Sequence, residues 1–100
     1  MHVIINHLPL QKGVNWAALT RSFENLEVML KSGEPEFRGC ALVKESDEAA
    51  TLVVTYATRA ALARISHHVA GPWFAEHVRP MLDGPAVRTI GEVVCGSALS

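Results

Sequence analysis

The fold is decided by one stretch in the middle of the chain, residues 37–57, which reads FRGCALVKESDEAATLVVTYA. Residues 37–44 and 51–57 are rich in residue types that suit strands, and the polar residues 45–48 join them. Two such runs separated by a short polar turn are typical of an antiparallel hairpin. The centre of the chain is therefore predicted to be a hairpin, and the fold class depends on what flanks it.

Upstream of the hairpin, the sequence predicts a strand followed by a helix. Residues 3–8 are mostly β-branched or apolar, and Pro9, which cannot donate to a sheet ladder, ends them. Asn15 is well placed to cap the next helix by accepting hydrogen bonds from its first turn. Gly33 and Pro35 end that helix. Its apolar stripe, spaced by three and four residues, consists of Trp16, Leu19, Phe23, Leu26 and Leu30.

Downstream of the hairpin, the sequence predicts a broken helix and a last strand. Thr58 is placed to cap a second helix, which Gly71 and Pro72 interrupt, and Pro72 favours the start of a short third helix. Residues 83–85 form a turn, and residues 87–95 alternate well enough for a fourth strand. The inward positions of the two helices are Leu62, Ile65, Val69, Phe74, Val78, Met81 and Leu82.

The order strand, helix, strand, strand, broken helix, strand is that of the ferredoxin-like split βαβ fold, an α+β class. We expect one domain over residues 1–100, with a four-stranded antiparallel sheet and the helices on one of its faces. The other face stays uncovered and is expected to pair with a second copy as a homodimer. The apolar residues assigned to that open face, depending on register, are Val3, Ile5, Leu42, Val54, Ile90 and Val94.

Composition excludes several classes of function. Nine Lys and Arg against ten Asp and Glu give a net charge of −1, and the basic residues are scattered, so no nucleic-acid partner is expected. The uncharged run between Glu48 and Arg59 is too short and polar to span a membrane. No secretion signal is visible at the N-terminus. Cys40 and Cys95 lack metal-ligand spacing and are interpreted as reduced core thiols, which fits a cytoplasmic protein.

Asn6 is the most informative polar residue, because it lies in an apolar central strand. A buried amide costs about 1–3 kcal/mol unless it is hydrogen-bonded. Two interpretations are equally weighted: Asn6 bonds to a neighbouring backbone group, or it projects into a pocket between the sheet and the helices.

A second group of candidates surrounds the predicted helix break. Trp73 and His77 are four residues apart on the third helix and share a face, which offers a flat apolar wall beside a group that titrates near neutral pH. Trp73 is alternatively a core or interface anchor, and His77 a surface residue. His67 and His68 are adjacent and cannot both point inward, so a three-histidine metal site is not expected.

The chain resembles the antibiotic biosynthesis monooxygenase family of dimeric α+β barrels. The resemblance rests on the order of elements, on the opening residues 3–6 (VIIN), and on a pattern that runs from Ala61-Leu62 through His68 to Pro72-Trp73-Phe74. It implies a homodimeric, cofactor-independent monooxygenase that oxidises a quinol or polyketide-type aromatic molecule with O2. It also implies a catalytic set of Asn6, which would donate to the phenolate oxygen, and His68 or His77 as base or proton relay, and a substrate-binding wall formed by Trp73 with Phe74. Tyr56, which the resemblance does not assign, is a further candidate for substrate binding because it could also reach a pocket.

Two alternatives stay open beside this interpretation. A haem-degrading branch of the same fold is similar to this chain at Asn6 and at His77, which matches the axial histidine of that branch. The tryptophan of that branch has no match in this chain. Haem binding therefore stays open as an alternative. The chain is alternatively a ligand-binding or structural dimer without catalysis, since a fold does not determine an activity.

Overall fold

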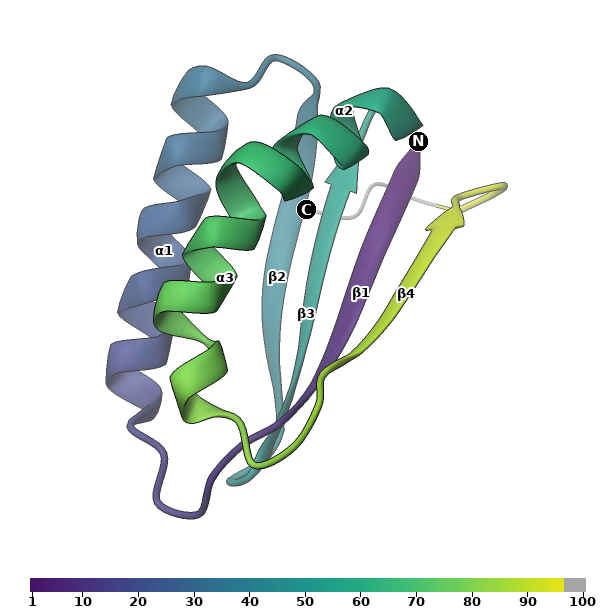
Figure 1. The fold of residues 1–100 in the computed structure, drawn as a ribbon. Coiled ribbons are helices and arrows are strands. Elements are labelled where there is room, and N and C mark those ends of the chain that lie inside the picture. Colours follow the sequence, from purple (N-terminus) through teal and green to yellow (C-terminus); the bar gives the residue numbers. More distant parts are fainter. Residues whose placement is uncertain (97–100) are drawn as a thin grey trace.

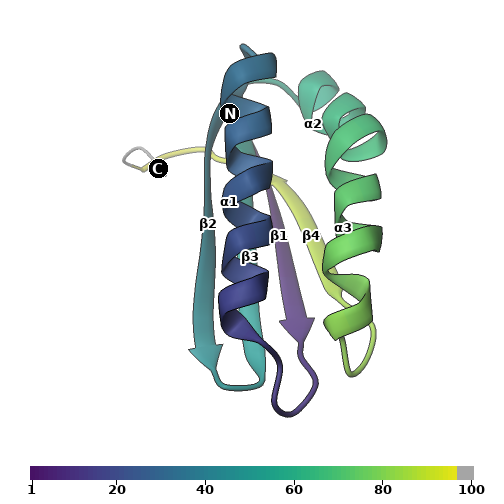
Figure 2. The same ribbon diagram turned by 90° about the vertical axis from the view of Figure 1, so that its left-hand side faces the viewer.

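The computed structural model describes residues 1–96, which form an α+β unit with a four-stranded antiparallel sheet. Helices lie side by side on one face of the sheet, and the other face carries none (Figures 1 and 2). This confirms the predicted ferredoxin-like arrangement. The elements are β1 (His2–Pro9), α1 (Trp16–Gly33), β2 (Phe37–Ser46), β3 (Ala49–Tyr56), α2 (Arg59–Ile65), a π-helical turn (Ser66–Ala70), α3 (Gly71–His77), a 3-10 turn (Arg79–Met81) and β4 (Val87–Glu92).

The strand order is β2-β3-β1-β4, so the first strand lies inside the sheet and the last strand forms an edge. Ile4 of β1 is paired with Val54 on one side and Ile90 on the other. Directly paired residues share a face, because side chains alternate with a period of two. Ile4 is 5% exposed under the helices, so its partners also point toward the helices.

This register corrects the predicted composition of the open face. Leu42, Val54 and Ile90 were expected on the open face but lie on the helix side, since Leu42 pairs with the buried Leu52 and the other two pair with Ile4. A shift of one residue in pairing moves every side chain to the other face, and local sequence does not fix this choice. The open face carries Val3 and Ile5, as predicted, together with Ala41, Val43, Thr51, Val53 and Thr89.

Helix α1 forms as its sequence predicts. The Asn15 side chain accepts a hydrogen bond from the Ala18 backbone N–H at 3.0 Å, which satisfies a free donor of the first turn. The apolar stripe faces the sheet, and Trp16 at its start is half-buried, with its indole N–H donating to the Asp47 carbonyl at 3.0 Å. The fully buried members of the stripe are Leu19, Phe23, Leu26 and Leu30.

The predicted short third helix is confirmed, since α3 begins at Gly71 with Pro72 in its first turn. The predicted break before it is instead a π-helical turn, through which α2 and α3 are joined without leaving helical geometry. The Gly71 backbone has φ −62° and ψ −52°, and its N–H donates to the Ser66 carbonyl, five residues back. A Cβ at this position would lie 2.4 Å from that carbonyl oxygen. Gly71 therefore permits the close approach of the Ser66 carbonyl in the π-helical turn, and Pro72, which has no N–H to donate, follows within the first turn of α3. Thr58 caps α2 as predicted, accepting from the Ala61 N–H at 3.1 Å.

Strand β4 is shorter than predicted and ends at Glu92, because its pairing partner β1 begins at His2, opposite Glu92. Cys95 lies beyond the strand and is exposed, so it is not a core thiol. Cys40 is half-buried, and its Sγ lies 3.5 Å from a Glu27 carboxylate oxygen. Burial and the Glu27 charge raise the pKa of Cys40 to about 12, which keeps this thiol protonated and unreactive at neutral pH.

Over residues 1–96, none of the helices is long and apolar enough to cross a membrane.

Candidate functional site

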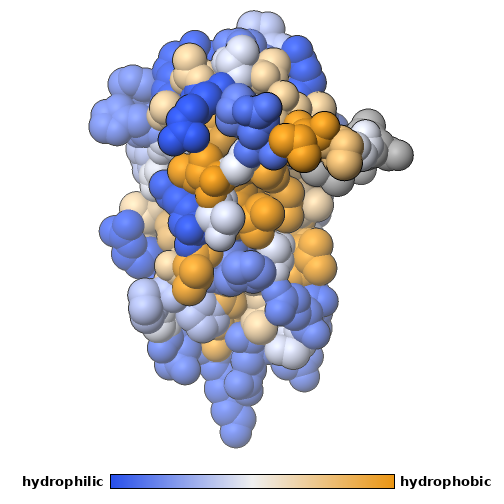
Figure 3. Space-filling view, turned by 90° about the vertical axis from the view of Figure 1, so that its right-hand side faces the viewer, coloured by the Kyte–Doolittle hydropathy of each residue, from blue (hydrophilic) through white to orange (hydrophobic). Residues whose placement is uncertain are grey.

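The candidate site lies where β4 extends the sheet beyond the helices. Seen from the side that β4 borders, hydrophobic residues gather in the middle of the molecule and hydrophilic residues flank them (Figure 3). A hollow of about 630 Å³ opens here between α3, the following loop and the sheet. This volume is in the range of small-molecule sites, roughly 300–1,000 Å³. The hollow is lined by Asn6, Gly71, Phe74, Arg79, Leu82, Gly84, Pro85, Ala86 and Arg88.

Asn6 lies in the floor of this hollow. Its side chain emerges from β1 on the helix side of the sheet and is 5% exposed. Within residues 1–96 no hydrogen bond to the Asn6 amide is formed, although the amide borders both the hollow and a small closed cavity next to it. Of the two interpretations of Asn6, the structure therefore places the amide at a pocket and not against a neighbouring backbone group.

Arg88 is a site residue that the sequence did not single out. It pairs with Asn6 across β1 and β4, so the two side chains leave the sheet on the same face. Arg88 lines the hollow, and no ion pair to it is formed by any described residue. The alternation of residues 87–95 puts Arg88 and Val87 on opposite faces of the strand. Only the register with β1 places Arg88 opposite Asn6. The site therefore combines an unpartnered amide with an unpaired positive charge.

The small closed cavity lies between the sheet and α3 and measures about 20 Å³, enough for about one water molecule. In the described part of the chain, this cavity beneath the helices is too small for an aromatic substrate. The reason is that Tyr56 and Trp73 occupy this space, at 0% and 6% exposure. The substrate-sized space is instead the open hollow at the β4 edge.

Tyr56 contributes a phenol to the wall of the closed cavity, and its hydroxyl has no hydrogen-bond partner among residues 1–96. Burial, and to a lesser degree the nearby Cys40 and Glu34, raise the pKa of Tyr56 to about 12. The phenol is thus neutral at pH 7, where it can donate a hydrogen bond but cannot serve as a base.

Trp73 and Phe74 form the apolar part of the site from α3. The indole N–H of Trp73 donates to the Ser22 carbonyl of α1 at 3.0 Å, which fixes the ring, and Trp73 and Phe74 both line the closed cavity. Phe74 also lines the open hollow. Trp73 is therefore both a core anchor and a wall of the cavity, whereas Phe74 faces the larger space.

The histidines lie away from this hollow. His68 is exposed, with its ring 4.7 Å from that of His67. The side chain of His77 is 41% exposed, its Nε2 lies 3.8 Å from a Glu76 carboxylate oxygen, and its ring lies 6.1 Å from that of Trp73. Neither His68 nor His77 lines the hollow or the closed cavity. In the described part of the chain, no three His, Cys, Asp or Glu side chains form a group suited to a metal ion.

The comparisons with known proteins bear on the fold. No family profile matches the sequence, and no curated protein matches it significantly. Solved structures do match. A protein from Nitrosomonas europaea, provisionally named an antibiotic biosynthesis monooxygenase, has a TM-score of 0.77 at 16% identity, with 95% of this chain and 100% of that chain covered. One from Caulobacter crescentus with the same provisional name has a TM-score of 0.78 at 18% identity, with 93% of this chain and 89% of that chain covered.

A third match is SnoaB from Streptomyces nogalater, described as a cofactor-independent oxygenase. Its TM-score is 0.76 at 11% identity, with 95% of this chain and 94% of that chain covered. Identities this low show a shared fold. The chain therefore has the α+β fold of proteins named antibiotic biosynthesis monooxygenases, over almost its whole length.

Proposed function

We propose that the protein is a cofactor-independent monooxygenase that oxidises an aromatic molecule with O2 in the hollow at the β4 edge. The observation that carries the proposal is the Asn6 amide, which lies in an otherwise apolar strand, belongs to a residue that is 5% exposed and borders a hollow of substrate size. An amide in this position can donate a hydrogen bond to a ligand in the hollow. The shared fold with an oxygenase described as cofactor-independent supports the same conclusion.

The chemistry suited to this site is oxidation of an anthrone-type methylene to a carbonyl. The substrate first loses a proton and becomes an enolate, whose oxygen accepts a hydrogen bond from Asn6 Nδ2 and is stabilised by the charge of Arg88. The methylene carbon gives four electrons to O2. One oxygen atom becomes the product carbonyl and the other leaves as water with both methylene protons, so the reaction balances without a further reductant.

The apolar walls hold the ring and limit the access of water. Phe74 borders the hollow directly, and Trp73 and Tyr56 line the closed cavity beside it. The high pKa of Tyr56 fits a neutral hydrogen-bond donor. The role of base that the resemblance gives to His68 or His77 stays a prediction without support from the geometry, because neither lines the hollow.

The experiment is O2 uptake by the purified protein with anthrone, compared with autoxidation of anthrone without protein. Asn6→Ala is expected to lower the protein-dependent rate by about 10²–10³-fold, as the loss of one donor to a developing oxyanion does. Asn25→Ala, which removes an exposed amide from α1, is the matched control and keeps the wild-type rate. Full activity of a folded Asn6→Ala protein contradicts the role of Asn6.

The same assay separates the alternatives. Haemin added to the protein gives a Soret band that depends on His77 if the haem interpretation holds. Absence of both O2 uptake and a Soret band favours a ligand-binding or structural dimer.

The proposal includes a homodimer formed through the open sheet face. Val3, Ile5 and Val53 form an apolar centre on the face that no helix covers (Figure 2). Face-to-face packing of two such sheets removes this surface from water.

A further inference from the structure

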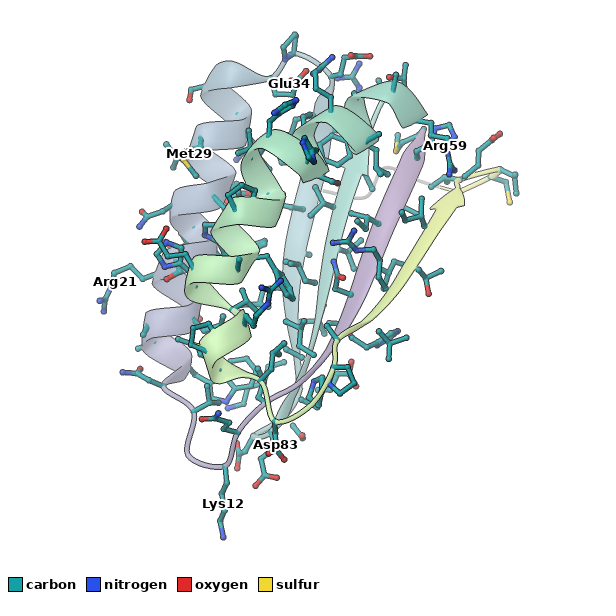
Figure 4. The ribbon with its side chains drawn as sticks, viewed as in Figure 1. Lys12, Arg21, Met29, Glu34, Arg59 and Asp83 are labelled. Carbon is teal, nitrogen blue, oxygen red and sulfur yellow. The ribbon has the colours of Figure 1, made fainter. Side chains whose placement is uncertain are left out.

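A second hollow, of about 460 Å³, lies beside the first at the start of α2. Arg59, His67 and Arg88 line it, together with apolar and small residues, and no Asp or Glu is among its lining residues. Figure 4 labels Arg59 at the end of the molecule where α2 begins and β4 finishes. The polar groups of this second hollow are therefore mainly nitrogen donors with positive charge.

The positive charges of the second hollow are not neutralised within residues 1–96. Arg59 and Arg88 have no carboxylate partner there, whereas Arg64, one turn further along α2, binds Glu34 at 2.8 Å. Glu92 shares a face of β4 with Arg88, but its carboxylate oxygen lies 3.8 Å from His2 Nε2. A site with two guanidinium groups and no acid fits an anionic ligand, because guanidinium forms paired hydrogen bonds with a carboxylate.

The two hollows adjoin each other. Gly71 and Arg88 line both, and Arg88 belongs to the strand that forms their common floor. One ligand can therefore place an aromatic ring near Asn6 and Phe74 and extend a charged group past Arg88 toward Arg59.

We propose that the second hollow binds a carboxylate group of the aromatic substrate, so that the enzyme selects aromatic carboxylic acids over neutral aromatics. This inference rests on the proposed function, which places the ring of the substrate in the first hollow. Arg59 is the specificity residue, because it lines the second hollow and not the first. Arg88 contacts both parts of the ligand, and His67 adds a hydrogen-bond donor.

The test uses two stable analogues of an anthrone product, anthraquinone-2-carboxylate and anthraquinone-2-carboxamide, with binding measured by calorimetry. They share the ring and differ in charge. The wild-type protein is expected to bind the carboxylate about tenfold more tightly, and added salt is expected to reduce this preference. Arg59→Gln is expected to remove the preference while carboxamide binding stays within about threefold. Arg21→Gln, on the far side of α1 in Figure 4, is the control and keeps the preference.

The outcomes distinguish this inference from the proposed function. Equal binding of both analogues by the wild-type protein overturns the carboxylate site and leaves the ring site intact. A preference that survives in Arg59→Gln overturns the assignment to the second hollow. If neither analogue binds, the ring site itself is contradicted, and both proposals fall together.

Discussion

Asn6 and Arg88 are direct cross-strand neighbours in the antiparallel pair β1–β4, although they lie near opposite ends of the chain. Both side chains leave the sheet on the face that the helices cover, because Asn6 shares that face with the buried Ile4 and pairs with Arg88. Strand β4, which carries Arg88, forms the edge of the sheet (Figure 1). The pair brings an amide donor and a guanidinium to one hollow. The proposed reaction depends on this pairing, because an enolate oxygen needs both a hydrogen bond and a positive charge.

Asn6→Leu tests whether the amide serves a ligand or the fold. Leucine has a similar shape and no polar atoms, so it places an apolar side chain at a position that is only 5% exposed, and we expect the free energy of unfolding to stay equal or rise by about 1 kcal/mol. Catalysis is lost in the same variant. Denaturant unfolding measures the effect, with Asn25→Leu on exposed α1 as control. A loss of about 2 kcal/mol or more would show that Asn6 is bonded within the protein.

Tyr56 is the single tyrosine of the chain, so its ionisation can be followed directly by ultraviolet absorbance. We expect a folded pKa of about 12 against the usual 10. Because the unfolded chain loses the phenol proton first as pH rises, the stability contributed by the neutral phenol is complete below pH 10 and is lost between pH 10 and 12. Titration of the native protein with a midpoint near 10 would disprove this.

Tyr56→Phe complements that titration. The variant removes a buried hydroxyl that has no partner within residues 1–96, so we expect an unchanged or higher melting temperature. A clear decrease would mean that the hydroxyl is hydrogen-bonded in the assembled protein.

Gly71→Ala tests the π-helical turn. Its new Cβ would lie 2.4 Å from the Ser66 carbonyl oxygen, a backbone atom that moves only with the helix, so we expect destabilisation by about 1–3 kcal/mol. The matched control is Gly33→Ala at the end of α1, where nothing lies within 4 Å of the new Cβ. That change is expected to stabilise by about 0.5–1 kcal/mol, as alanine does in helices. Thermal unfolding measures both effects, and equal changes in melting temperature for the two variants would contradict the close packing at Gly71.

Glu34→Gln tests the ion pair that joins the C-terminal end of α1 to α2. Arg64 hydrogen-bonds to Glu34 at 2.8 Å and, together with the Glu36 backbone N–H, lowers the pKa of Glu34 from its usual 4.5. The unfolded carboxyl therefore takes up its proton first as pH falls. The stabilisation is complete above pH 4.5 and is lost as pH falls through the lowered pKa. The difference in free energy of unfolding between the wild type and Glu34→Gln, measured by denaturant unfolding, should thus disappear in acid. The control Glu24→Gln, at an exposed position of α1, should not differ from the wild type in this way.

Ile5→Asp tests the proposed dimer. Ile5 lies on the helix-free face between Val53 and Thr89, so a carboxylate there would be buried by a second sheet and should yield a monomer. Sedimentation velocity measures the molecular mass. Val28→Asp, at a 65% exposed position of α1, is the control and keeps the wild-type mass. A monomeric wild-type protein, or a dimeric Ile5→Asp protein, would contradict this interface.

The sequence alone determined the features that depend on neighbouring residues. Asn15 and Thr58 cap their helices because each side chain reaches backbone donors within its own first turn. The stripe from Leu19 to Leu30 faces the core because helical spacing aligns it. Asn6 stood out because an amide is costly in an apolar strand. These local signals were enough to order the elements and to predict the fold class.

Only the tertiary structure decided which distant residues meet. The pairing of β1 with β4 set the register, placed Arg88 beside Asn6 and moved Val54 and Ile90 to the helix side. The π-helical turn replaced the break predicted from Gly71 and Pro72, because the missing side chain of glycine lets two backbone segments approach. Strand register depends on segments that are far apart in the chain, and a side-chain pattern with a period of two fits either face of the sheet equally well. The close approach at Gly71 depends on how the backbone packs, which the pattern of side chains does not describe.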